Sequence, residues 1–483
     1  MPTPANIIID TRPLWIVVLA RSRQALLMAV GAALFWWVST AQPPAGLSPA
    51  GQKALAVFSL CVFYWVFDVL PLMITSVLAI ILLPLSGAMT PSKTYSLFGN
   101  EAVFFILGVF ILAACLMKSG LSTRVALAML RRFGHTPRTL LVSVLLLNAG
   151  MSFVMSEHAV AAMNFPIILE LAAVLGLRGR HTRYGKALFL AMAWGSTIGG
   201  VATLLGGARA PLALGMLKEA TGKSFSFAEW SLAILPLVGA MLLVCYVILV
   251  RFFPIDITSV QAADDVLRQK SLALGRMRFN ERAIGTVMLF TFAAWVFGGE
   301  EFGLANIALA AVVALFVLGL VTWREVEGYV NWGVILMYGG AICLGAAINE
   351  SGAAAWIAQA TVSRWATGGP GVVMMLSFLA IVLTEAMSNS AVVALMMPVS
   401  LGIAREFGMD PRIMALTIAV PAGLWYTLPI GTPANAIAYS SGLLTIRDMV
   451  GAGLCLAVCS WLTFNLMANW YWPLLGLSIQ GAR

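Results

Sequence analysis

The chain has 483 residues, of which 61% are hydrophobic and only 10% are charged. A soluble globular protein carries roughly 25% charged residues, so this sequence has too few charges to cover a water-exposed surface. The formal net charge of +9 does not indicate a nucleic-acid partner, because the basic residues lie between apolar runs, where they mark the cytoplasmic side of a membrane.

Apolar runs long enough to cross a membrane recur between Ala25 and Leu475. In lipid every backbone polar group must be satisfied within the protein, so helices are expected, and the alternating pattern of an outer-membrane barrel is absent. We therefore predict an all-α polytopic membrane protein. The predicted spans are near residues 24–40, 53–69, 71–88, 102–117, 187–215, 231–250, 283–299, 303–321, 332–349, 413–442 and 447–475.

Two further apolar segments, 139–170 and 372–402, are long and interrupted. The first has strongly basic flanks on both sides, which places both of its ends in the cytoplasm. A segment that enters and leaves on one side is a re-entrant hairpin, which is tolerated only when it is buried in protein or lines a cavity. By parity the second segment is expected to be a hairpin that enters from outside. Basic residues before the first span place the N-terminus inside.

The sequence repeats itself at an offset of 232 residues. The pattern MSxxAVxAxxxP begins at Met155 and again at Met387, and Gly108 and Ser119 fall on Gly340 and Ser351. Each copy would hold five spans and one hairpin, so the second copy is inverted in the membrane. Inverted repeats with broken helices at the midplane are typical of alternating-access carriers.

The predicted organisation has four parts, which follow the repeat. They are an N-terminal segment with the first span (1–50), repeat 1 (51–250, with hairpin 139–170 and broken helix 187–215), a cytoplasmic connector (251–282) and repeat 2 (283–483, with hairpin 372–402 and broken helix 413–442).

Four polar stretches interrupt the apolar segments, at residues 156–158, 203–210, 388–390 and 427–435. Gly and Pro unwind a helix there and expose backbone carbonyls, which can hold a cation. The neighbouring helix N-termini carry partial positive charge, which favours an anion. The four stretches therefore predict a site for a small anion and a cation.

These motifs resemble those of the divalent anion:sodium symporter (DASS) family. The Ser-Asn-Ser stretch at 388–390 and the Gly-Thr-Pro-Ala-Asn stretch at 431–435 are similar to the family's paired hairpin-tip and broken-helix motifs. The stretches 65–71 and 472–477 are also similar to the family's early and C-terminal segments. The resemblance extends from about residue 50 to the end.

The resemblance implies eleven spans, two re-entrant hairpins, scaffold and transport domains, and a homodimer in a bacterial plasma membrane. It implies elevator-type transport of di- or tricarboxylates, sulfate or a sulfonate, usually driven by sodium, with no organic cofactor. By carry-over, sodium in the second half-site is held by Ser388, Asn389, Gly431 and Asn435, and the anion by Asn389, Ser390, Thr432 and Pro433. The alternative is a cluster of small polar residues that packs helices together.

The first half-site departs from the family pattern. Ser156 is kept, but Glu157 and His158 replace Asn-Thr, and Arg209 enters the Gly-rich break. Ionisable groups within membrane segments are costly and are functional candidates by default. We expect Glu157 and Arg209 to form an ion pair whose guanidinium substitutes for the first sodium ion, with Ser156, Glu157, His158 and Arg209 all candidates for contact with the substrate.

The sequence leaves several readings of this half-site open. Glu157 or His158 could titrate and couple transport to protons, or Arg209 could be a fixed counter-charge for a carrier with one sodium ion or for an exchanger. Arg209 could also grip the substrate bidentately, and the site could be a decayed one in which Glu157 and His158 only cap the hairpin tip. A further alternative is a carrier of another organic or inorganic anion in the same superfamily.

An enzyme is not expected. Ser156, Glu157 and His158 include the residue types of a hydrolytic triad, but consecutive residues cannot easily form the facing relay, so no catalytic residue is assigned. Near the second tip, Glu385 is expected either to cap a helix or to orient Asn389.

Overall fold

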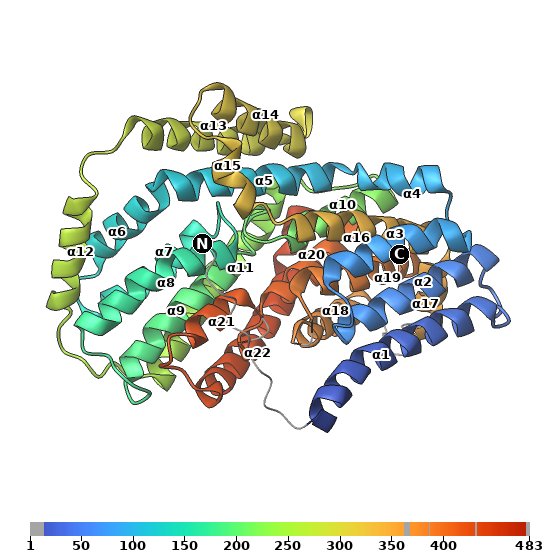
Figure 1. The fold of residues 1–483 in the computed structure, drawn as a ribbon, viewed down its shortest axis with the longest axis horizontal. Coiled ribbons are helices and arrows are strands. Elements are labelled where there is room, and N and C mark those ends of the chain that lie inside the picture. The colour runs from blue at the N-terminus through green and yellow to red at the C-terminus, as the bar shows by residue number, and fades with distance from the viewer. Residues whose placement is uncertain (1–13, 362–367, 386, 430–431, 480–483) are drawn as a thin grey trace.

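The structure is a computed structural model that describes residues 14–361, 368–385, 387–429 and 432–479 (Figure 1). Throughout these ranges the regular structure is helical, and six helices in them are long and apolar enough to cross a membrane. Four shorter apolar helices accompany these six. The prediction of an all-α polytopic membrane protein is confirmed.

The helices of the first half run in the following order: α1 (Leu14–Thr40), α2 (Pro49–Val66), α3 (Leu72–Ser86), α4 (Pro91–Phe98), α5 (Glu101–Ser119), α6 (Leu121–Phe133), α7 (Pro137–Met151), α8 (Glu157–Val174), α9 (Arg183–Gly199), α10 (Arg209–Thr221) and α11 (Phe227–Phe252).

The connector helix α12 and the second half follow: α12 (Gln261–Ala273), α13 (Phe279–Phe302), α14 (Leu304–Val317), α15 (Trp323–Val326), η1 (Glu327–Tyr329), α16 (Trp332–Glu350), α17 (Ala353–Thr361), α18 (Gly369–Thr384), α19 (Asn389–Glu406), α20 (Pro411–Ala419), η3 (Pro421–Gly423), α21 (Pro433–Tyr439), α22 (Ile446–Trp470) and η4 (Trp472–Leu475).

The helix starts follow the sequence repeat. Helices α6, α7 and α8 each begin 232 residues before α17, α18 and α19. The N-caps correspond as well, because Thr90 and Thr322 precede α4 and α15, and Ser226 and Thr445 form capping boxes on α11 and α22. A hydroxyl at the N-cap satisfies a backbone donor that the helix leaves unpaired, so the same local signals begin the same helices in both copies.

The first hairpin consists of α7, a turn and α8, and its two ends lie together. Tyr184, at the start of α9, donates its hydroxyl to the carbonyl of Pro137, at the start of α7, at 2.7 Å. The carboxylate of Asp256 accepts from the backbone N–H groups of Arg183 and Tyr184 at 3.0 and 3.1 Å. The start of α7 therefore lies beside the start of α9, the helix that follows the hairpin. The cytoplasmic location of both flanks stays a prediction.

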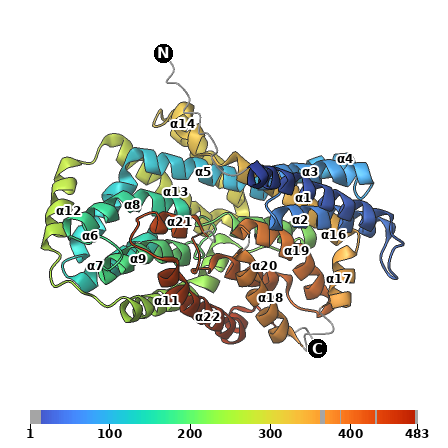
Figure 2. The same ribbon diagram turned by 60° about the horizontal axis from the view of Figure 1, so that its bottom comes forward.

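The second half of each broken helix packs into the other repeat. Helix α10 contacts α19 and α20, and α21 contacts α8 and α9. In Figures 1 and 2, helices α6 to α9 and α12 lie at one end of the molecule, and α1 to α4 and α17 lie at the opposite end. The cross-packing joins each broken helix to the hairpin of the other repeat.

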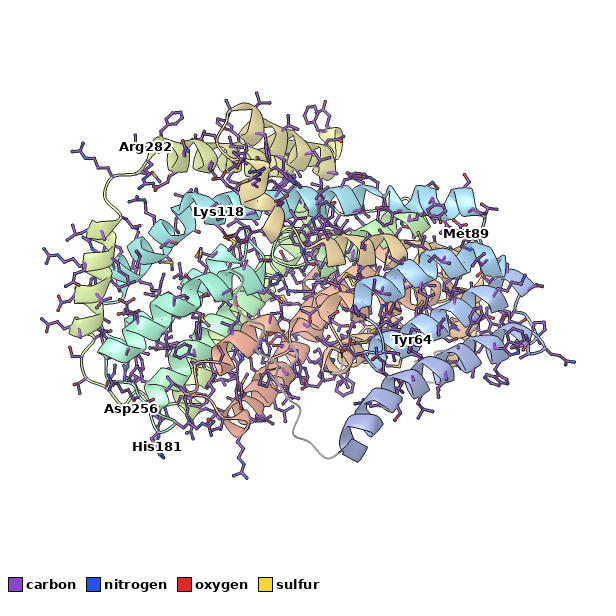
Figure 3. All side chains as sticks on the ribbon, viewed as in Figure 1. Tyr64, Met89, Lys118, His181, Asp256 and Arg282 are labelled. Carbon is purple, nitrogen blue, oxygen red and sulfur yellow. The ribbon has the colours of Figure 1, made fainter. Side chains whose placement is uncertain are left out.

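The connector between the repeats (251–282) is held by ion pairs at the end of the molecule where α6 to α9 and α12 lie. Asp256 and His181 are labelled at this end in Figure 3. Lys270 of α12 pairs with Glu170 of α8 at 2.6 Å, and Arg124 of α6 pairs with Glu281 of α13 at 2.9 Å. The connector therefore touches the base of the first hairpin as well as α6.

The predicted spans differ from the helices mainly where the chain is amphipathic or broken. Helices α6 and α12 carry several basic residues on a short length, so a search for long apolar runs does not find them. The predicted broken helix 413–442 consists of α20, η3 and the seven-residue α21, because Pro421 and Pro433 each begin a new helical segment.

We predict that Asp256→Ala lowers the apparent unfolding temperature of the purified protein in detergent. The substitution leaves two backbone donors at the start of α9 without their carboxylate, and loss of a cap costs about 1 kcal/mol. Asp265→Ala, at an exposed position on α12, is the control and should change little. Equal unfolding temperatures for the two variants would contradict the role given to Asp256.

Candidate functional site

The first hairpin tip (residues 156–158) rests on the first break (residues 200–208). The backbone N–H of Glu157 donates to the carbonyl of Gly206 at 2.9 Å, and the hydroxyl of Thr203 donates to the carbonyl of Phe153 at 2.7 Å. These bonds satisfy backbone groups that neither helix can pair, as the interior of a membrane protein requires. The tip and the break therefore form one unit.

Within this unit Glu157 and Arg209 are in direct contact. Both terminal nitrogens of Arg209 donate to Oε2 of Glu157, at 3.1 and 3.2 Å, and each residue is only 3% exposed. The structure therefore brings together the two ionisable groups that the sequence predicts to pair. Because the charges are in contact and shielded from solvent, each cancels most of the cost of burying the other.

Three glycines make the space for this pair. A Cβ atom on Gly423 would lie 2.3 Å from Nε of Arg209, and one on Gly207 would lie 2.5 Å from Nη1. A Cβ atom on Gly200 would lie 2.7 Å from Oε2 of Glu157. Gly423 belongs to η3 of the second repeat, so the guanidinium is held between both repeats. Sequence analysis missed Gly423, because its only local signal is the Pro421–Gly423 turn before the predicted break.

The helix dipoles favour the carboxylate and disfavour the guanidinium. Glu157 is the first residue of α8, where a negative charge is stabilised by the positive end of the helix. Arg209 is the first residue of α10, where a positive charge faces the same unfavourable end. The guanidinium of Arg209 is therefore stabilised at this helix end by Glu157. The carboxylate of Glu157 lies at a helix end that favours negative charge.

The two hairpin tips meet at this pair. Asn389, the first residue of α19, places its side-chain Nδ2 3.5 Å from Oε1 of Glu157, and the two residues are separated by the repeat offset of 232. The contact is a long hydrogen bond. Equivalent positions of the two copies therefore lie face to face, and both carboxylate oxygens of Glu157 have a protein donor.

The remaining residues of the first tip contact each other. Oγ of Ser156 lies 3.3 Å from Nε2 of His158, and the Ser156 hydroxyl does not cap α8. His158 is half-buried. The hydroxyl that the family motif keeps at this position is therefore engaged by the imidazole that replaces the motif's third residue.

The second half-site has a different set of contacts. Oγ of Ser388 accepts from the backbone of Ala391 at 3.3 Å, and Oγ1 of Thr432 accepts from the backbone of Asn435 at 3.2 Å. Both hydroxyls thus cap the helices that begin there. Gly431, a predicted sodium ligand, lies outside the residues that the structure describes.

The side chain of Asn435 has one oxygen without a partner. Its Nδ2 donates to the carbonyl of Leu428 at 3.3 Å, but its Oδ1 is buried and receives no hydrogen bond from the described part of the chain. An unpaired buried acceptor is unfavourable, and a side-chain carbonyl oxygen is a suitable ligand for a hard cation. This atom fits the predicted sodium ion.

The predicted anion contacts of the second half-site differ in exposure. Asn389 and Ser390 are half-buried, Pro433 is exposed and Thr432 is buried, while the predicted sodium ligand Ser388 is exposed. Of the two roles expected for Glu385, the structure supports the cap, because Glu385 occupies the C-cap position of α18. Its carboxylate accepts from the hydroxyl of Thr427 at 3.2 Å and so joins the second hairpin to the break that faces it.

Comparison with known proteins identifies the family. The family described as "Sodium:sulfate symporter transmembrane region" matches residues 22–478. The chain belongs to this divalent anion:sodium symporter (DASS) family. It is therefore a multi-pass membrane protein from a family of secondary anion transporters.

Curated relatives of this DASS protein have consistent names. The sodium-dependent dicarboxylate transporter SdcS of Staphylococcus saprophyticus is 28% identical over 465 residues, which are 90% of this chain and 89% of the relative. SdcS of Staphylococcus aureus strain MW2 is also 28% identical, over 467 residues, with the same coverage. These relatives are transporters and not enzymes.

Solved structures with a similar fold are also membrane transporters. Neisseria gonorrhoeae MtrF, described as one of a class of antimetabolite efflux pumps, matches with a TM-score of 0.54 and 13% identity over 95% of each chain. The YdaH transporter of Alcanivorax borkumensis matches with a TM-score of 0.54 and 15% identity, over 96% of this chain and 99% of that one. At these identities the likeness concerns the fold alone.

We predict that Glu157→Gln and Arg209→Met each destabilise the protein by about 3 kcal/mol, because each leaves one buried charge unpaired. The double variant should recover part of that loss, because it removes both charges. Thermal unfolding in detergent of the wild type, the two single variants and the double variant measures the coupling between the two residues. Glu350→Gln, which breaks an exposed ion pair with Lys93, is the control and should have almost no effect. A double variant as unstable as the sum of the single variants would contradict the coupling.

We also predict that Gly423→Ala reduces both the unfolding temperature and anion uptake, because the new methyl group would displace the guanidinium of Arg209. Gly239→Ala on α11 is the matched control, since a Cβ atom there meets nothing within 4 Å. The control should be neutral or slightly stabilising, as expected for alanine in a helix. Wild-type uptake by Gly423→Ala would show that the space left by the missing side chain at position 423 is not required.

Proposed function

We propose that this chain is a sodium-coupled symporter that carries a small anion across a bacterial plasma membrane, with the Glu157–Arg209 pair in place of one sodium ion. The observation that carries the proposal is the buried guanidinium of Arg209, which lies against the first tip and contacts the second repeat. In this proposal the guanidinium takes the place that the family resemblance assigns to a mobile ion, and Glu157 balances its charge.

The proposed mechanism is elevator-type alternating access. The repeats at 51–250 and 283–483, joined by the connector 251–282, would form a scaffold and a transport domain in each protomer of a homodimer, with the N-terminus in the cytoplasm. The cross-packing of α10 on α19 and of α21 on α8 supports this division. Because both hairpins and both breaks pack together, they can move as one body while the site stays intact.

In the proposed carrier sodium binds at the second half-site. Ser388, Asn389, Gly431 and Asn435 would hold it, and the unpaired Oδ1 of Asn435 supports this assignment. Ser390, Thr432 and Pro433 would line the adjacent anion site. Sodium is transported together with the anion in this scheme, so it acts as a co-substrate.

The same geometry favours a fixed counter-charge over proton coupling. A proton-coupled carrier needs a titrating group that exchanges protons with water, and Glu157 is 3% exposed and has donors on both oxygens. Arg209 is equally buried, so it is also poorly placed to grip a substrate. The pair therefore acts as a neutral, permanent part of the site.

Uptake into proteoliposomes tests the proposal. Labelled succinate, citrate, sulfate and sulfonates would be offered with an imposed sodium gradient or with an imposed pH gradient in sodium-free buffer. The proposal predicts that an inward sodium gradient accelerates uptake and that the pH gradient alone does not. Uptake driven by the pH gradient without sodium would instead indicate a proton-coupled carrier.

We predict that Asn435→Ala raises the sodium concentration needed for half-maximal uptake about tenfold, which corresponds to ~1.4 kcal/mol of lost binding. The reason is that the variant removes the oxygen assigned to the ion. Asn306→Ala, at an exposed position on α14, is the matched control. An unchanged sodium requirement in Asn435→Ala, with uptake preserved, would contradict the assignment.

A further inference from the structure

The two half-sites differ in what they can offer to a ligand. At the first tip the two carboxylate oxygens of Glu157 already accept hydrogen bonds, Oε1 from Asn389 and Oε2 from Arg209. The Ser156 hydroxyl lies within hydrogen-bond distance of His158. At the second tip Ser390 is half-buried and Pro433 is exposed. The protein's own carboxylate therefore takes the anion position of the first half-site, and the second half-site is left for the substrate.

The position of Glu157 resembles that of a bound anion in three respects. It lies at the N-terminus of α8, it contacts the first residue of α10, and it contacts the first residue of α19. Helix N-termini are favourable places for carboxylates. A side chain that belongs to the protein thus fills the place where one end of a doubly charged substrate would sit.

The charges of the site lead to the same conclusion. Glu157 and Arg209 sum to zero, and Arg209 is the only buried Lys or Arg among the described residues. Glu385, at the second break, adds no positive charge, so in this scheme the remaining positive charge of the site is that of one sodium ion. A singly charged anion balances that ion. A doubly charged anion would leave one negative charge without compensation, and uncompensated charge is strongly unfavourable wherever the protein excludes water.

Resting on the proposed function, we infer that the substrate of this carrier bears a single negative charge, such as one carboxylate or one sulfonate group, and that its other end is uncharged. The anionic group binds at the second tip, where Ser390 and the N-terminus of α19 can donate to it. The uncharged end faces the first tip, where Glu157 already takes the donors of Arg209 and Asn389 that a second carboxylate would need. This differs from the dicarboxylates in the names of the curated relatives.

The test compares anions of matched shape and different charge. Succinamate and succinate differ by an amide in place of one carboxylate, and methanesulfonate and sulfate differ by a methyl group in place of one charged oxygen. Sodium-driven uptake of each is measured in proteoliposomes at pH 7.5 with the full-length wild-type protein. The inference predicts that the singly charged member of at least one pair is transported at least tenfold more efficiently than its partner.

The outcomes separate the inference from the proposal on which it depends. Equal or better uptake of succinate and sulfate would overturn the inference and leave a sodium-coupled anion carrier in place. Absence of sodium-driven uptake for carboxylates, sulfonates and sulfate alike would overturn the proposed function itself, and the inference with it.

A charge variant adds an independent measurement. Glu157→Gln leaves Arg209 uncompensated, so the site gains one positive charge and the ratio of doubly to singly charged uptake should rise at least tenfold. Glu350→Gln changes the same residue type on the exposed surface and should leave the ratio unchanged. A ratio that stays at the wild-type value in folded Glu157→Gln would contradict the inference, and if this variant does not fold, the wild-type comparison still decides.

Discussion

The architecture of this site depends on one buried ion pair. Glu157 and Arg209 would each be costly in a membrane interior, and Arg209 also sits at the unfavourable end of α10. They are tolerated because they touch each other and because glycines at 200, 207 and 423 leave room for both. One of those glycines comes from the second repeat, so the pair also joins the two halves of the molecule.

The pair makes the two half-sites unequal, although the chain is built from equivalent helices. The first tip is closed by its own charges, while the second keeps helix-capping hydroxyls, an unpaired buried oxygen on Asn435 and accessible side chains. In the proposed function, a scaffold of equivalent helices with one self-neutralised half would need fewer ions and fewer substrate charges than two equal half-sites. The proposal thus rests on where the fold departs from its own repeat.

Much of this arrangement was predictable from the sequence, because it rests on local signals. The offset between Met155 and Met387 places both hairpins, while the orientation that the basic flanks give to the first stays a prediction. The pairing of Glu157 with Arg209 was predictable because both departures from the family pattern fall in one half-site. Gly423 was not predictable, since its contact with Arg209 exists only when the repeats are packed. The side-chain partner of Glu385 was not predictable for the same reason, because Thr427 comes from a different segment.

The most direct test of the central claim is the number of sodium ions transported with each anion. Reversal measurements in proteoliposomes, in which opposing sodium and substrate gradients are balanced until net flux stops, give this ratio. If the guanidinium of Arg209 replaces one ion, flux will stop when the sodium gradient equals the opposing substrate gradient, which is a ratio of one to one at zero membrane potential. A ratio of two or more sodium ions per anion would contradict the account in which the second half-site holds the one transported ion and Arg209 takes the place of another.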